Sequence, residues 1–201
     1  ATEFPLLQQS ARETGAIAIQ NRGTIGGNIA NASPAADTPP SLLVYDAELE
    51  IQSVRGVRQV PYSDFHRGYK QMDLAPGELI TKVRLKRPSS DEQGRRVHYY
   101  RKVGTRAAQA ISKICLAGFA CVQGERISQL RIGLGSVAPI PLRCPKTESV
   151  LTQGPLTEAL IRRAEATLAY EITPIDDVRS TALYRRKVTL NLLREFASRC
   201  L

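Results

Sequence analysis

Residues 112–122 constrain the fold of this chain most, because apolar side chains occupy both alternating sets of their positions. A strand of that kind is covered on both faces, as an internal strand of a sheet is. Its apolar centre, residues 114–122, has strand length and is much too short to span a membrane. The chain is therefore expected to fold around a buried internal strand and to contain no membrane-spanning segment.

Neighbouring segments extend this strand into a sheet. Residues 97–103 are a strand candidate, and the alternation over residues 130–134 predicts another, so we expect an antiparallel meander of about three strands. Two helices follow, one with Thr157 as its N-cap and one beginning at about Ser180. Both are predicted to pack on the sheet through apolar positions, which are Leu156, Leu160, Ile161, Ala164 and Leu168 in the first and Tyr184, Val188, Leu192, Leu193 and Phe196 in the second.

The first half of the chain mixes short helices and strands. Residues 3–14 predict a helix, and Pro39 stands where another can begin. Leu49 and Ile51 alternate with polar residues as in a half-exposed strand, whose hairpin partner would be residues 57–60. Residues 78–85 predict a further strand, with its odd-numbered residues on one face and its even-numbered residues on the other.

The polar stretch of residues 89–96 is the candidate boundary between two domains. The length of 201 residues, 42% of them hydrophobic, is enough for one domain with a real core or for two small ones. The prediction is an α+β protein with domains at residues 1–90 and 95–201.

The net charge of +9 raises the question of a nucleic-acid partner. The basic residues are scattered, however, only 5% of all residues are aromatic, and tryptophan does not occur. A stacking platform for single strands is therefore poorly supplied, and no nucleic-acid-binding signature is found. A solvated basic surface, or one that faces an acidic partner subunit, is the better interpretation.

Neither a metal site nor catalysis by side chains is predicted. The four cysteines show no C-x-x-C pairing and lie apart from both histidines, whereas zinc and iron–sulfur sites need closely grouped ligands. Cys115 and Cys121 fit a reduced core. Asp64 and His66 are interpreted as surface polar residues, and residues 176–177 as capping groups for the last helix. If the chain takes part in catalysis, it does so by holding a cofactor.

Residues 22–38 form a turn-rich segment that is the best candidate for a cofactor site. Its pair Gly26 and Gly27 lets the backbone approach a ligand closely, and successive backbone N–H groups of that kind suit a phosphate. Short polar side chains that can reach a ribose or a ring edge are Asn28, Ser33, Asp37 and Thr38. By composition alone the segment also fits an ordinary surface loop.

This glycine-rich segment resembles the second FAD-binding segment of the molybdenum hydroxylase flavoproteins, the family of xanthine dehydrogenase and carbon monoxide dehydrogenase flavoprotein subunits. Further blocks resemble the same family in the same order, at residues 4–7, 76–80, 100–113 and 172–193. The resemblance implies the second subdomain of a PCMH-type FAD-binding domain. A small antiparallel sheet packed with helices, like the C-terminal domain of carbon monoxide dehydrogenase flavoproteins, would follow it.

The resemblance also implies which residues meet the cofactor. Residues 24–28 would wrap the FAD diphosphate, and Asp37 would take a polar role. Ile80 would pack on the isoalloxazine ring, and Lys102 would lie near it, where a cation favours reduced, anionic flavin. The residues assigned to the cofactor are therefore Thr24, Ile25, Gly26, Gly27, Asn28, Ser33, Asp37, Ile80 and Lys102.

The function implied by the resemblance is the FAD-binding portion of a xanthine dehydrogenase-like enzyme of purine catabolism. Electrons would pass from a molybdenum centre through iron–sulfur clusters to FAD, and from FAD to NAD. The iron–sulfur domain and the molybdopterin subunit would be partners in a cytoplasmic hetero-oligomer. Two alternatives stay open: the flavoprotein of a related hydroxylase acting on carbon monoxide, an aldehyde or an aromatic CoA thioester, and a non-catalytic basic module that binds nucleic acid or an acidic protein.

The family's other FAD loop, of the Gly-Gly-Thr-Asp kind, and its iron–sulfur domains do not occur in this sequence. The chain also begins without methionine and without the pattern of a secretory signal. We therefore expect one part of a larger protein or assembly in a reducing cytosol. By itself such a part would bind FAD weakly or not at all.

Overall fold

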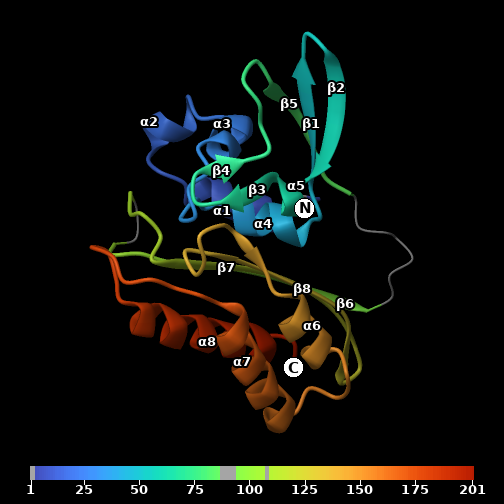
Figure 1. Cartoon of the computed structure of the whole chain (residues 1–201). Helices are drawn as coiled ribbons and strands as arrows, with labels where there is room; N and C mark the ends of the chain where they lie inside the picture. The colour runs from blue at the N-terminus through green and yellow to red at the C-terminus, as the bar shows by residue number, and fades with distance from the viewer. Residues whose placement is uncertain (1–2, 87–93, 107–108) are drawn as a thin grey trace.

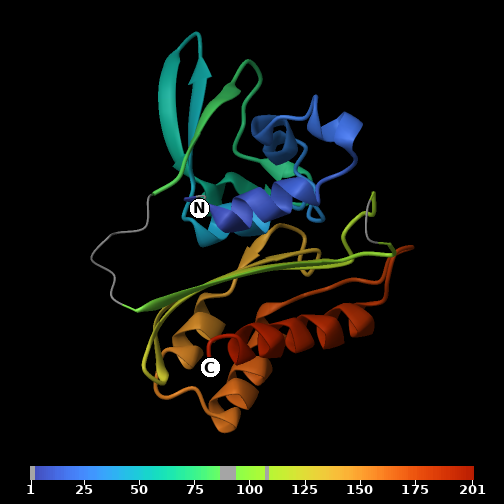
Figure 2. The same ribbon diagram turned by 180° about the vertical axis from the view of Figure 1, so that it is seen from behind.

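An antiparallel sheet crosses the middle of the molecule, as the computed structural model shows for residues 3–86, 94–106 and 109–201 (Figure 1). Its strands are β6 (Arg95–Val103), β7 (Ile114–Gln123), β8 (Arg126–Gly135) and β9 (Leu142–Arg143), adjacent in that order. The helices α6 (Pro145–Leu151), α7 (Glu158–Glu171) and α8 (Ala182–Ser198) lie on one side of the sheet, and all earlier elements lie on the other (Figure 2). The predicted meander is confirmed, with β9 as an unexpected fourth strand.

Strand β7 is buried at every position from Ile114 to Val122, as the sequence predicts for an internal strand. Its two faces belong to different cores because successive side chains point to opposite sides of a sheet. One face packs into the core shared with the C-terminal helices, through Leu116, Ala120 and Val122. The other face packs against the first half of the chain, through Cys115, Ala117 and Phe119.

The two C-terminal helices confirm the predicted packing, with one exception. The Thr157 side chain caps α7 by accepting a hydrogen bond from the Leu160 N–H at 3.2 Å, and Thr181 caps α8 in the same way. Asp176 accepts a hydrogen bond from the Ala182 N–H in the first turn of α8, so its predicted capping role is confirmed. Tyr184 was assigned to the packed face but is exposed. Helix α6 was not predicted.

The first half of the chain begins with four short helices, which are α1 (Pro5–Arg12), α2 (Ile17–Gln20), α3 (Ile25–Ala30) and α4 (Pro39–Val44). Its strands β1 (Glu48–Ser53), β2 (Gly56–Pro61) and β5 (Leu79–Arg84) form one sheet in the order β2-β1-β5. The single turn α5 (Tyr62–Phe65) and the small pair β3 (His66–Gly68) and β4 (Gln71–Met72) complete it. The helix at the N-terminus, the start at Pro39, the hairpin and the strand β5 are confirmed.

Two details of this half differ from the prediction. β1 is the central strand, so Glu50 is buried between its neighbours and donors from Arg84 and Thr81 reach its carboxylate. The register between β1 and β5 shifts at Glu50/Ile51, which breaks the strict alternation expected for β5. The candidate boundary at residues 89–96 falls mostly outside the described residues, and its end, from Arg95, belongs to β6.

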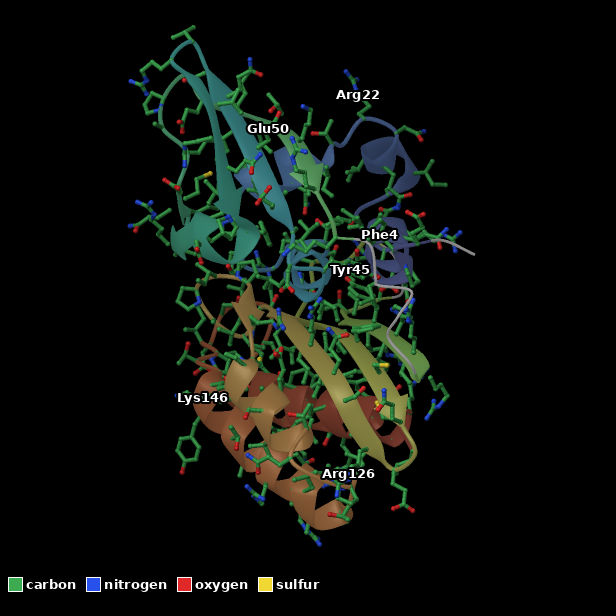
Figure 3. All side chains as sticks on the ribbon, turned by 90° about the vertical axis from the view of Figure 1, so that its right-hand side faces the viewer. Phe4, Arg22, Tyr45, Glu50, Arg126 and Lys146 are labelled. Carbon is green, nitrogen blue, oxygen red and sulfur yellow. The ribbon has the colours of Figure 1, made fainter. Side chains whose placement is uncertain are left out.

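Polar and aromatic contacts fasten α1 and α4 to each other. The Tyr45 hydroxyl accepts a hydrogen bond from the Leu6 N–H at 3.1 Å, and the Ser41 hydroxyl donates one to the Leu6 carbonyl at 3.1 Å. The rings of Phe4 and Tyr45 meet edge to face with centroids 5.2 Å apart (Figure 3). These contacts hold α1 firmly, so it can serve as one wall of a site.

Candidate functional site

A pocket of about 710 Å³ lies between α1, α2 and α3. Its lining brings together residues of the predicted glycine-rich segment with residues of α1 and α2. Arg22, between α2 and α3, lies at the outer end of this region (Figure 3). The residues that line the pocket are Leu7, Ala11, Thr14, Ile19, Gln20, Arg22, Gly23, Thr24, Ile25, Gly27, Asn28, Asn31 and Thr38.

The glycine pair lies within α3, whereas the sequence predicted a turn-rich loop. Thr24 starts this helix, because its side chain accepts a hydrogen bond from the Gly27 N–H at 3.0 Å. Gly26 turns away from the pocket toward β5, where a Cβ would stand 3.7 Å from the Ile80 carbonyl oxygen. The two glycines therefore face different ways: Gly27 lines the pocket, and Gly26 faces β5, where a Cβ would make ordinary van der Waals contacts.

Asn28 is held on the pocket wall from behind. The Thr38 hydroxyl donates a hydrogen bond of 2.6 Å to its Oδ1, and both residues line the pocket. Because Oδ1 accepts this bond, the amide NH₂ of Asn28 remains as the donor of the side chain. Thr38 thus couples the segment before α4 to α3.

Asp37 and Lys102 form an ion pair of 2.7 Å directly behind this wall, with side chains only 10% and 8% exposed. Lys102 reaches across from β6 and also donates a hydrogen bond of 2.8 Å to the Glu13 carbonyl. Burial raises the pKa of the Asp37 carboxyl above its ordinary value, although the bond from Lys102 works in the opposite direction. The second carboxylate oxygen, Oδ1, is buried and has no hydrogen-bond partner among the described residues.

This pair touches the pocket through its neighbours in the chain. Asp37 precedes Thr38, and Glu13 precedes Thr14, and both threonines line the pocket. The described lining itself includes neither Asp37 nor Lys102. Lys102 is thus buried and paired, and its position is very different from that of an ordinary surface lysine.

The structure does not bring every predicted residue to the pocket. Ser33 accepts a hydrogen bond of 3.3 Å from the Ala35 N–H, so it shapes the turn before α4. Ile80 is partly buried against the core of the first half and meets α3 at Gly26. The pocket joins four of the predicted residues, which are Thr24, Ile25, Gly27 and Asn28.

Sequence reasoning missed the walls contributed by α1 and α2. Leu7, Ala11 and Thr14 sit on the helix that the sequence did predict, but nothing in its pattern marked a ligand-facing side. The sequence carried no signal for α2 either, because the exposure of Ile17 and Ile19, 76% and 57%, is visible only in the fold. Of these two, Ile19 lines the pocket.

His66 and the cysteines, which are the other candidates for chemistry in this sequence, are not among the residues that line this pocket. His66 was interpreted as a surface residue but is buried: its Nε2 lies 3.1 Å from the Tyr62 hydroxyl, and burial lowers its pKa to about 4. All four cysteines are buried and outside any disulfide, and burial raises the pKa of Cys115 to about 12, which makes it a poor nucleophile. The described residues contain no cluster of three or more potential metal ligands.

None of the described helices combines the length and the apolar character that crossing a membrane requires.

Comparison with known families identifies both halves of the chain. The family described as the FAD binding domain in molybdopterin dehydrogenase matches residues 1–88. The family described as the CO dehydrogenase flavoprotein C-terminal domain matches residues 98–200.

Curated relatives agree with these matches. The putative xanthine dehydrogenase FAD-binding subunit of Escherichia coli is 30% identical over 97% of this chain, and the carbon monoxide dehydrogenase medium chain of Afipia carboxidovorans is 31% identical over 99% of it. The chain spans 66% and 67% of the lengths of these two relatives.

Among solved structures, the reconstituted CO dehydrogenase from Oligotropha carboxidovorans superposes with a TM-score of 0.90 at 27% identity. The match covers 98% of this chain and 68% of that one.

Proposed function

The chain belongs to the family of FAD-binding flavoprotein subunits of molybdenum hydroxylases, and we propose that it supplies part of the FAD site of a xanthine dehydrogenase-like enzyme. In this proposal electrons from iron–sulfur clusters reach NAD through the flavin. The iron–sulfur and molybdopterin-containing chains are its partners in a cytoplasmic hetero-oligomer of purine catabolism. Residues 1–90 would hold the cofactor, and residues 95–201 would form the flavoprotein C-terminal domain.

The observation that carries the proposal is the pocket between α1, α2 and α3 with a buried, unpartnered carboxylate oxygen behind its wall. Its volume lies within the range of about 300–1,000 Å³ that small-molecule sites occupy. The lining combines apolar side chains with a few polar groups at Thr24, Asn28 and Thr38. A site of that composition fits a cofactor with an apolar ring and a polar diphosphate, so the residues present suit FAD.

We assign the diphosphate and its neighbouring atoms to the start of α3. Thr24, Ile25, Gly27 and Asn28 line the pocket there, and Arg22 lies close enough in sequence to add a cation. Gly26 faces β5 and would contribute only through its backbone, and Ser33 would act indirectly by shaping the turn before Asp37. Ile80 lies on β5 outside the described lining of the pocket, and its contact with the isoalloxazine ring remains a proposal from the family resemblance.

Asp37 and Lys102 would complete the polar part of the site. Asp37 does not line the pocket, so in this proposal its carboxylate would act on the cofactor from behind the wall, through its neighbour Thr38 and through the charge it shares with Lys102. Lys102 holds the carboxylate in place and would keep a positive charge close to the flavin ring. The bound flavin would itself supply the electron-transfer chemistry.

The substrate of the whole enzyme is proposed by analogy alone. The relatives are named for xanthine, glyceraldehyde, carbon monoxide and nicotine, and this range shows that similar flavoprotein chains occur with different substrates. Xanthine is our first assignment and NAD our proposed acceptor. Carbon monoxide, an aldehyde or an aromatic CoA thioester are the alternatives.

The flavin content of the full-length protein tests the cofactor site. We expect the purified protein to show flavin absorption, and Asp37→Ala and Lys102→Ala to weaken FAD binding by about tenfold or more, because each leaves a buried charge without its partner. Asp64→Ala is the matched control, since Asp64 is exposed and bonds only to Ser63 among the described residues. Full-length protein without flavin after mild purification would contradict the proposal.

A further inference from the structure

A second surface of the molecule has no role in the proposed cofactor site. It lies at the end of the central sheet where the segment joining β6 to β7 meets the segment before α8 (Figure 1, left edge; Figure 2, right edge). Large apolar side chains gather there with 42% to 102% of their surface exposed. We call this surface the end patch; its members are Ile111, Ile175, Val178, Leu183 and Tyr184.

Direct contacts join the two segments that carry the end patch. The Lys113 ammonium lies 5.3 Å from the centre of the Tyr184 ring, and the Lys113 carbonyl accepts a hydrogen bond of 3.1 Å from Arg185. Ile111 lies two residues before Lys113, and Leu183 lies beside Tyr184 in the first turns of α8. The two segments that carry these apolar side chains are therefore joined directly, although they come from distant parts of the chain.

The turn that carries Val178 is fixed before any partner arrives. Asp177 and Ser180 exchange backbone hydrogen bonds of 3.0 and 3.2 Å. The Asp177 Oδ1 also accepts bonds from the Arg179 N–H and from the buried Arg185, both at 2.8 Å. A turn ordered by this many bonds presents Val178 to solvent at little further entropic cost, which favours binding.

The charge around the end patch is positive. The carboxylates of Asp176 and Asp177 are turned to internal donors, namely the Ala182 N–H and the groups just described. The basic side chains at the surface here are Lys113, Arg179 and Lys187, whereas Arg185 is buried and Arg186 donates a hydrogen bond to the Ala169 carbonyl. An apolar centre with a basic rim is complementary to an apolar surface with an acidic rim.

A second copy of this chain fits the end patch poorly. A symmetric dimer would bring the same basic rim against itself, and the whole chain already carries a net charge of +9. An acidic partner would meet no such repulsion, and both tyrosine and arginine are enriched among the residues that dominate binding energies.

We propose that the end patch docks an acidic-rimmed surface of another protein subunit of the same enzyme. This inference rests on the proposed hetero-oligomer and assigns the surface through which this chain binds its partner subunit. The docking surface and the flavin pocket use different residues, so the two can fail independently.

Two valines provide a matched pair of variants for the test. Val178 is 102% exposed at the tip of the patch, and Val54 is 106% exposed at the tip of the β1–β2 hairpin, away from the patch. We expect Val178→Asp to weaken association with the purified iron–sulfur and molybdopterin-containing chains about tenfold or more, measured by analytical ultracentrifugation. Val54→Asp should leave it unchanged, and Leu183→Asp should repeat the effect of Val178→Asp. The wild-type affinity should fall as salt is raised.

Equal affinities for Val178→Asp and Val54→Asp would overturn the proposal. So would wild-type self-association that Val178→Asp alone abolishes, or binding of the patch to anionic lipid vesicles in place of the protein chains. Flavin absorption of each variant is recorded in parallel. Association that depends on Val178 in a protein without flavin would support the docking surface and contradict the FAD site. A protein that binds flavin but whose association does not depend on Val178 would support the FAD site and contradict the docking surface.

Discussion

The two sides of the central sheet are built in different ways. On the side of α6, α7 and α8, one large core joins the sheet to the helices and includes Leu116, Ile132, Leu193 and Phe196. On the other side, short helices cover smaller clusters, and α2 buries none of its residues. The first side is stabilised by its own packing, whereas the second leaves apolar surface beside the proposed cofactor site. Binding sites are commonly drawn from such less stable regions.

The side with the short helices is nevertheless held in place by hydrogen bonds from the central sheet. The Tyr100 hydroxyl donates a hydrogen bond of 3.0 Å to the Asp37 carbonyl, and Arg143 donates one of 3.0 Å to the Leu43 carbonyl. Lys102 joins both Asp37 and Glu13 to β6. Hydrogen bonds from the central sheet therefore hold the inner wall of the pocket in place, whereas α2, which forms the outer wall, buries none of its residues.

The largest expected effect is on the free energy of unfolding, compared between one residue from each side of the sheet. Leu116→Ala should lower the free energy of unfolding by about 3 kcal/mol, because Leu116 is fully buried in the large core and its loss leaves a cavity. Ile19→Ala should change it by less than about 0.5 kcal/mol, since Ile19 is mostly exposed. Urea unfolding measures both. Equal losses would break the comparison.

The junction between the sides gives the next effect. Gly133 on β8 lies so close to Pro40 of α4 that a Cβ there would overlap the Pro40 carbonyl oxygen. Gly133→Ala should cost about 2 kcal/mol through overpacking. Gly154→Ala is the control, because nothing lies within 4 Å of the added carbon. Stability retained in Gly133→Ala would show that the sides can move apart without cost.

Helix caps sharpen the comparison further. Thr157→Ala removes the cap of α7 and should cost about 1 kcal/mol in urea unfolding. Thr24→Ala removes the cap of α3 in the same way, but α3 lies on the less stable side and lines the pocket. We expect Thr24→Ala to weaken FAD binding of the full-length protein more than it lowers stability. The opposite ranking would count against a binding role for α3.

The smallest effect concerns pH and the sheet of the first half. The Arg84 guanidinium, followed by Lys82, lowers the pKa of Glu50 from 4.5 to about 2. Its contribution to stability is therefore complete above pH 4.5 and is lost as the pH falls toward about 2. Glu50→Gln should melt at a lower temperature than wild type at neutral pH, and this difference should shrink on acidification. A difference in melting temperature between Glu50→Gln and wild type that does not shrink as the pH falls would contradict the stabilising role assigned to Glu50.

Predictions that rested on contacts close in sequence were confirmed. The unbroken apolar run of β7 predicts a strand that is covered on both faces. Thr157 stands one residue before α7, and this position predicts its role as the N-cap. Predictions failed where distant residues decide burial. Glu50 is buried in the central strand β1, and Arg84, 34 residues away, donates a hydrogen bond to its carboxylate. α3 has six residues, too few to be stable alone, so no local pattern announced it.

The candidate site shows the same division. The glycine-rich segment and the family were recognisable from the sequence, because a backbone that approaches a ligand needs particular residue types in a row. The sequence by itself thus determined the internal strand, the cap of α7 at Thr157 and the glycine-rich segment, part of which lines the pocket. Only the tertiary structure joined Asp37 to Lys102, 65 residues apart, and set α1 and α2 opposite α3. Burial and ion pairing depend on distances in space, which residue order along the chain does not specify.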